Sequence, residues 1–315
     1  MCEETCTERE AVMTERKTDL ALEIRESFPR NDVEIQGVVL EKHYDKKGKA
    51  HITKVQIKDD RGSQAMGKPK GCYVTIESED MPKEGISKED LLLSICGELE
   101  KMVKGLRHKS VLIAGLGNRQ VTSDSLGPRM AECIFVTRHL EREFGSRFMK
   151  ENEYGNVSAI APGVMAQTGM EAVEILQGIV KKTSPDLVIV VDALAARSMS
   201  RLCTTIQLTD TGISPGSGIG NHRKALSKES LGVPVIAIGV PTVVDAKTII
   251  SDHLERVLTK QGYSSGEIEQ FLQEVFQDEM DNLFVTPKNI DESVGIIAKD
   301  LAKILNRCFQ KKSFR

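Results

Sequence analysis

Unbroken runs of apolar residues, rich in valine and isoleucine, recur along the chain and alternate with amphipathic stretches. The apolar runs cover residues 110–115, 157–161, 187–192 and 233–239. Runs of this length suit strands that are buried on both faces, as in a parallel sheet covered by helices. Stretches with helical spacing lie near residues 124–143, 168–181 and 245–259. The alternation predicts βαβ units and a three-layer α/β/α domain with a mostly parallel central sheet.

The first part of the chain has a different pattern, because short strands follow one another there without long helices. Expected strands cover residues 33–40, 51–57 and 72–77, with turn-like polar segments between them. An amphipathic stretch begins near residue 19. We expect residues 20–85 to form a small strand-rich part, which is either a subdomain or an extension of the main sheet.

Two further helices are expected after this part. Ser87 is the expected N-cap of a helix whose apolar face contains Leu92, Ile95 and Leu99. The C-terminal tail is expected to begin a helix at Thr286-Pro287 and to carry an apolar face as far as Cys308. That face is expected to contact the domain or another subunit. One more strand is expected at 203–208.

Composition excludes several classes of protein. The 315 residues have a net charge of -3 and no dominant basic face, so direct binding of nucleic acid is not expected. The sequence contains no run of about 18 apolar residues, so no membrane span is predicted. The polar N-terminus lacks the apolar core of a secretion signal. The seven cysteines are odd in number and scattered, which indicates free thiols in a reducing compartment. Cys2 and Cys6 have no partner pair that would suggest a metal site.

Most familiar catalytic and cofactor motifs are missing. Gly115 and Gly117 follow a strand as in a dinucleotide site, but Gln120 stands where the third glycine is required. A nucleotide-binding module therefore stays a weaker alternative. The glycines at 216, 218 and 220 have no helix signal behind them, so we interpret residues 216–220 as part of a mobile loop. No Gly-x-Ser-x-Gly or His-Glu-x-x-His motif is present, and the histidines lack ligand spacing.

Acidic residues at the ends of predicted strands are the remaining candidates. Asp192 ends an apolar run directly, and Asp124 follows another run by a few residues. Asp245 has a similar position between a strand and a helix. Ligand crevices in open α/β sheets lie at the carboxyl ends of the strands, so Asp124 and Asp192 are expected to meet there. Helix capping or a salt bridge is the alternative role for each acid.

Two carboxylates within hydrogen-bonding range repel each other, which raises one pKa and lowers the other. One carboxylate then takes a proton from water while the other polarises a scissile carbonyl, as in aspartic peptidases. This chemistry needs no metal and no cofactor. The same acids are also suitable oxygen ligands for a divalent cation, and a metal-assisted peptidase is therefore the second alternative.

At these positions the chain resembles the germination protease family of spore-forming bacteria. The resemblance rests on blocks in the family's order: KTDLALEIRE (17–26), LIAGLGN (112–118), VTSDSLGPR (121–129), APGVMAQTGME (161–171), VVDALAARS (190–198) and IGVPTVVDA (238–246). It implies an endopeptidase of the spore cytoplasm that initiates degradation of small acid-soluble spore proteins during germination. It also implies a homotetramer and a fold similar to hydrogenase maturation proteases.

The resemblance also assigns roles to residues of this chain. The family's two proposed catalytic aspartates correspond to Asp124 and Asp192. Relatives that bind a metal use an acid and a histidine, and no histidine lies beside the equivalent blocks here, which favours the metal-free pair. Family members are zymogens that cut themselves near the N-terminus. The resemblance places this cut at Asp19–Leu20, with residues 1–19 as the propeptide and 20–315 as the peptidase domain.

Overall fold

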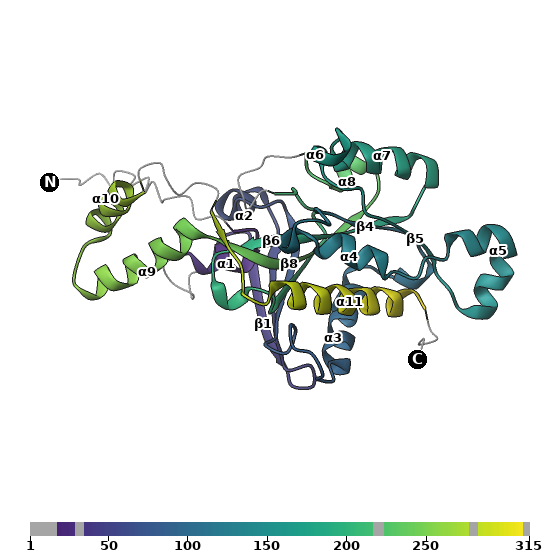
Figure 1. The fold of residues 1–315 in the computed structure, drawn as a ribbon, viewed down its shortest axis with the longest axis horizontal. Helices are drawn as coiled ribbons and strands as arrows, with labels where there is room; N and C mark the ends of the chain where they lie inside the picture. The colour runs from purple at the N-terminus through teal and green to yellow at the C-terminus, as the bar shows by residue number, and fades with distance from the viewer. Residues whose placement is uncertain (1–17, 29–34, 217–223, 277–282, 311–315) are drawn as a thin grey trace.

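The computed structural model describes residues 18–28, 35–216, 224–276 and 283–310. Within these ranges a single mixed sheet runs through the whole molecule (Figure 1). Most of the strands expected from the sequence are present in this sheet, and the predicted α/β class is confirmed.

The centre of the sheet is parallel. Strand β6 (Leu187–Ala196) lies between β4 (Ser110–Gly115) and β8 (Val235–Asp245), and β5 (Asn156–Ile160) continues the sheet beyond β4. These four strands correspond to the four apolar runs of the sequence. Strands β6 and β8 both run past the ends of their apolar runs, so the carboxyl end of this parallel region extends further than the sequence pattern predicts.

On the other side of β8 the sheet is antiparallel. Strand β7 (Thr205–Thr209) pairs with β8, and then β3 (Gly71–Glu77), β2 (Ala50–Ile57) and β1 (Val38–Asp45) follow in order. The strand-rich N-terminal part is therefore an extension of the main sheet, which decides between the two alternatives left open by the sequence. A short strand, β9 (Phe284–Val285), pairs with the end of β8.

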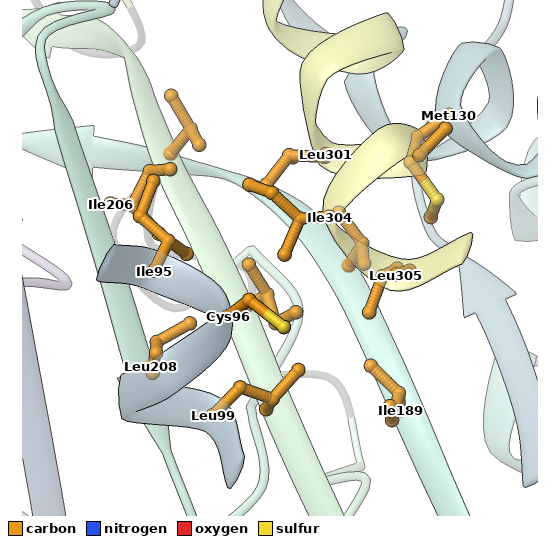
Figure 2. Close-up of a cluster of buried hydrophobic side chains, with 14 of the residues drawn as sticks. Ile95, Cys96, Leu99, Met130, Ile189, Ile206, Leu208, Leu301, Ile304 and Leu305 are labelled. Atoms are coloured by element: carbon orange, nitrogen blue, oxygen red, sulfur yellow. The ribbon is translucent and has the colours of Figure 1, made fainter. Parts of the chain in front are cut away.

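Helices cover both faces of the sheet, so the predicted three-layer arrangement is confirmed. On one face, α3 (Glu89–Met102), α4 (Leu126–Glu132) and α11 (Ile290–Phe309) bury the larger core, and Figure 2 shows side chains of α3 and α11 meeting those of the strands. On the other face, α7 (Ala172–Thr183) and α8 (Lys228–Leu231) bury a smaller core. Alternate residues of β6 contribute to the two cores, as expected for a strand buried on both sides.

The remaining helices lie at the ends and edges of the sheet. Helices α9 and α10 extend from one end of the molecule and α5 from the other (Figure 1). The bounds of the remaining helices, including the 3-10 turns η1 to η3, are α1 (Ala21–Glu26), α2 (Asp60–Met66), η1 (Leu106–His108), η2 (Thr122–Asp124), α5 (Arg138–Asn152), α6 (Met165–Thr168), η3 (Met199–Arg201), α9 (Ala246–Lys260) and α10 (Ser265–Val275). No helix among the described residues is long and apolar enough to cross a membrane.

Several predicted element boundaries are wrong. The helix expected near 124–143 is divided into α4 and α5, because the buried Thr137 between them donates to the Gly155 carbonyl and accepts from the Val157 amide of β5. Helix α2 occupies a segment that was expected to be a turn.

The expected helix starts also differ from those observed. Helix α3 has Lys88, not Ser87, at its N-cap, and α11 has Asn289 there, so that Thr286 and Pro287 precede the helix.

Candidate active site

Asp192 lies on the parallel strand β6, at the point where this strand lines a cavity. Its neighbours Val188 and Val190 belong to the core beneath α7, and Asp192 continues the same face of the strand. The residue is only 4% exposed. Its Oδ1 accepts a hydrogen bond from the Ala193 amide at 2.9 Å. Because the ladders with β4 and β8 hold the backbone on both sides, the position of this carboxyl group is set by the sheet.

Asp124 is positioned by the loop that follows β4. The amide of Leu116 donates to the Val191 carbonyl at 2.8 Å, which continues the contact between β4 and β6 beyond the strand. Gly117 then turns the chain with a φ of +109°, and the Asn118 amide donates to Asp124 Oδ2 at 2.7 Å. Asp124 itself ends the 3-10 turn η2. The loop folds back on itself, so Asp124 returns to the end of the strand that the loop left.

Thr242 on β8 holds the same turn from the other side. Its hydroxyl donates at 2.7 Å to the carbonyl of Ser123, the residue directly before Asp124. The side chain is only 1% exposed, and it lines the cavity that contains both acids. Sequence reasoning missed this residue. The only sequence signal for Thr242 is its place in the segment Pro-Thr-Val-Val-Asp, which continues an apolar strand. This signal does not show where the hydroxyl points.

Asp124 and Asp192 line one cavity of about 250 Å³. Asp19, the acid of the expected self-cleavage site, lines it as well. Most of the other lining is apolar or glycine: Leu116, Gly117, Val121, Gly163, Val164, Ala172, Ala193, Leu194, Ala195, Pro215, Gly216, Val243 and Phe284. A cavity with apolar walls and a few acidic groups is suited to binding a short stretch of polypeptide beside those acids.

Asp245, the third acid considered, has a structural role. Its Oδ2 accepts from the Thr248 amide at 3.0 Å and caps the N-terminus of α9. Asp245 is not among the residues that line the cavity. Asp245 resembles the catalytic candidates in sequence, because it also stands between a strand and a helix. In the structure this position is a helix cap, which is the alternative role expected for such an acid.

Gly115 has a packing reason for being glycine. A Cβ atom added at Gly115 would lie 2.0 Å from the Gly127 carbonyl oxygen, and one added at Gly127 would lie 2.3 Å from the Leu116 carbonyl oxygen. Helix α4 therefore contacts the end of β4 through two glycines. This close contact accounts for the glycine at position 115, so a bound phosphate is not needed to explain it. The predicted loop at residues 216–220 lies outside the described residues, apart from Gly216.

A larger groove of about 1030 Å³ lies between the segment 83–89 and α11. Two of its acids are held in ion pairs, with Lys88 Nζ 2.8 Å from Asp300 and Arg307 2.6 Å from Glu89. No residue at the carboxyl end of β4 or β6 lines this groove. Among the residues that the structure describes, no group of three or more His, Cys, Asp or Glu side chains is arranged to hold a metal ion.

Comparison with known proteins agrees with the resemblance of the sequence blocks. The model of the germination protease family matches residues 15–270. A germination protease of Caldanaerobacter subterraneus is 43% identical over 307 residues, covering 92% of this chain and 92% of that protein. The chain belongs to the germination protease family. It is thus a member of a peptidase family, and the resemblance proposed from the sequence is confirmed.

Other germination proteases give the same result. One from Clostridium perfringens is 39% identical over 311 residues, covering 93% of this chain and 95% of that protein. One from Priestia megaterium is 43% identical over 256 residues, covering 78% of this chain and 68% of that protein. Among solved structures, a nickel–iron hydrogenase maturation protease from Thermococcus kodakarensis matches with a TM-score of 0.36 and 19% identity, covering 67% of this chain and 98% of that chain.

Proposed function

We propose that this germination protease is an aspartic-type endopeptidase in which Asp124 and Asp192 activate the attacking water. The observation that supports the proposal is their position: both acids line one cavity, and they reach it from the carboxyl ends of the neighbouring parallel strands β4 and β6. Active sites of open α/β sheets occur at this edge. Two acids that line one cavity there can supply the base and the acid of general acid–base hydrolysis.

In the proposed mechanism, one carboxylate accepts a proton from a water molecule as its oxygen attacks the peptide carbonyl. The other acid, protonated, donates a hydrogen bond to that carbonyl and stabilises the developing charge. The proton then passes to the leaving amine as the carbon–nitrogen bond breaks. Because two interacting acids share their protons, the roles of base and acid belong to the pair.

The substrates that we propose are the small acid-soluble spore proteins, cut in the spore cytoplasm at germination. The proposal extends to self-processing of a zymogen at Asp19–Leu20 and to a homotetramer, as the resemblance to the family implies. The structure supports the first of these, because Asp19 lines the cavity that contains Asp124 and Asp192. Asp19, the residue before the proposed cut, therefore shares a cavity with the proposed catalytic acids of the same chain.

Replacement of the two acids tests the proposal. We expect Asp124→Asn and Asp192→Asn each to lower the rate of self-cleavage, and of cleavage of a purified small acid-soluble spore protein, by about 1000-fold or more, because each removes a proton-transfer group. Intact-protein mass spectrometry and gel assays give the rates. Asp245→Asn is the matched control, since its capping oxygen is kept and it lies outside the cavity. Activity within a few fold of the unmodified protein in either cavity variant would contradict the assignment.

Two treatments separate the alternatives. A metal-assisted peptidase would lose activity in a chelator and regain it with added divalent metal, whereas the proposed acid pair would keep its activity. A nucleotide-binding module would gain thermal stability from nucleotides by mass action. We expect neither effect. A clear gain of stability with nucleotides, together with no cleavage of spore proteins, would favour the binding module.

A further inference from the structure

The segment around the Asp19–Leu20 bond is fixed on both sides within the described structure. The Asp19 amide donates to the Ala195 carbonyl at 2.9 Å, and the Ala195 amide donates to Asp19 Oδ2 at 2.9 Å. Leu20 is fully buried in an apolar cluster that includes Leu194 and Val244. The carboxylate and the following aliphatic side chain are both held, so the peptide bond between them has a defined orientation.

Two donors converge on the carbonyl oxygen of this bond. Lys68 Nζ donates to the Asp19 carbonyl at 3.2 Å, and Gln207 Nε2 donates to the same oxygen at 3.2 Å. The Oε1 of Gln207 accepts from the Ala21 amide at 2.7 Å. The amide group of Gln207 therefore bridges the backbone on both sides of Leu20, and it is oriented by both contacts.

Both donors are positioned before any reaction occurs. Lys68 follows Gly67, which ends α2 with a φ of +57°, and the Ser63 hydroxyl donates to the Lys68 carbonyl at 2.7 Å. The side chain is half-buried, yet burial around the ammonium group lowers the pKa of Lys68, with an opposing effect from the charge of Asp19. Gln207 is buried in β7, between β3 and β8. A buried amide in a strand requires partners, and residues 19 and 21 supply them.

Lys68 and Gln207 do not line the cavity that Asp19 shares with Asp124 and Asp192. The donors to the carbonyl oxygen are therefore distinct from the groups that would activate water. Hydrolysis requires both: a base beside the attacking water, and donors for the oxygen that becomes negatively charged.

We propose that Lys68 and Gln207 form the oxyanion-binding pair for self-cleavage at Asp19–Leu20. This inference rests on the proposed function, which supplies the acids that activate water. It adds a positively charged donor and an amide donor, which the aspartate pair by itself does not provide.

The reaction with these groups is ordinary hydrolysis. The oxygen of water bonds to the Asp19 carbonyl carbon, one proton of that water moves to the aspartate pair, and the carbonyl electron pair moves to the oxygen held by Lys68 and Gln207. That electron pair then re-forms the carbonyl as the bond to the Leu20 nitrogen breaks. The nitrogen takes a proton from the aspartate pair. The products are an Asp19 α-carboxylate and a Leu20 α-amine.

The test measures self-cleavage of the full chain carrying Lys68→Met, Lys68→Arg or Gln207→Glu. We expect Lys68→Met to slow the first-order cleavage, followed by intact-protein mass spectrometry, by about 100-fold, as for removal of other oxyanion donors. Lys68→Arg keeps a cationic donor and is expected to recover part of the rate. Gln207→Glu replaces a donor by a negative charge and is expected to be at least as slow as Lys68→Met. Lys58→Met, at an exposed lysine, is the matched control.

A second measurement separates stabilisation of charge from simple anchoring of the segment. In the uncut Asp124→Asn background, hydrogen exchange at the Ala21 amide reports whether the segment stays bound. The inference predicts slow exchange with and without Lys68→Met, together with the 100-fold loss of cleavage rate in the chain that retains Asp124. A rate within threefold of the unmodified protein, or a loss of rate matched by an equal loss of protection, would overturn it.

The failure of this inference can be distinguished from failure of the proposed function. If the chain cuts spore proteins in an Asp124- and Asp192-dependent way but never cuts after Asp19, only the oxyanion pair is wrong. If cleavage persists in Asp124→Asn and Asp192→Asn, the proposed chemistry is wrong, and the oxyanion pair that rests on it is overturned with it.

Discussion

The two candidate acids reach the same cavity from regions that are built in different ways. Asp192 belongs to β6, which is paired with β4 as far as Val191 and with β8 at Asp192 itself. Asp124 belongs to a loop of about ten residues, and a turn, an amide contact and one threonine hold it. The first position is specified by the sheet as a whole. The second depends on a few individual contacts, which can be removed one at a time.

This difference suggests that stability and activity should separate when the two regions are altered. A change beneath the strands should affect both quantities, because the sheet and the site share the same backbone. A change within the loop should affect activity more than stability, because few buried groups depend on it. Three substitutions, which differ in their expected effect, test this separation, and each has a matched control variant.

Gly127→Ala should have the largest effect. The new Cβ would lie 2.3 Å from the Leu116 carbonyl oxygen and 2.6 Å from that of Val191, so α4 must move away from the strand ends. We expect a loss of about 3 kcal/mol in the free energy of unfolding, as for severe overpacking, together with a loss of most activity. Chemical denaturation measures the first. Gly178→Ala, in the middle of α7 with open space around it, is expected to stabilise instead.

Gly117→Ala should affect activity more than stability. Its φ of +109° is unfavourable for alanine, and the new Cβ would lie 2.1 Å from the Asp124 carbonyl oxygen. The loop must therefore shift Asp124, and we expect about a 100-fold lower cleavage rate. The melting temperature should fall by less than in Gly127→Ala. Gly169→Ala is the control, because it shares a positive φ but meets no atom within 4 Å. Equal losses of activity in both variants would show that strain alone, not displacement of Asp124, is responsible.

Thr242→Val should have the smallest effect of the three. It keeps the shape of the side chain but leaves the Ser123 carbonyl without its hydroxyl donor. The expected loss is about fivefold in kcat, with KM nearly unchanged, since a hydrogen bond of this kind contributes about 1 kcal/mol. Thr242→Ser restores the hydroxyl and should restore most of the rate. If the serine variant is as slow as the valine variant, the methyl group rather than the hydrogen bond matters.

The strands and the strand acid were predictable because their signals are local. An apolar run that ends in an aspartate identifies Asp192, and the fold places strand ends at one edge. The division between α4 and α5 was not predictable, because it depends on contacts of Thr137 with β5. Thr242 was missed for the same reason: its role depends on a carbonyl 119 residues away in sequence. The start of α11 was misplaced because Thr286-Pro287 is a local helix-start signal that the folded chain does not use.

The attachment of residues 18–26 has a consequence for the order of events during synthesis. Gln207, which holds the Asp19 carbonyl, lies 188 residues further along the chain. This N-terminal segment can therefore dock only after β6, β7 and β8, which lies between them and pairs with both, have been made. Contacts between residues so far apart in sequence are among the slowest to form. Docking of the N-terminal segment thus marks a finished sheet, and any reaction that requires this docked geometry must wait until the protein has folded.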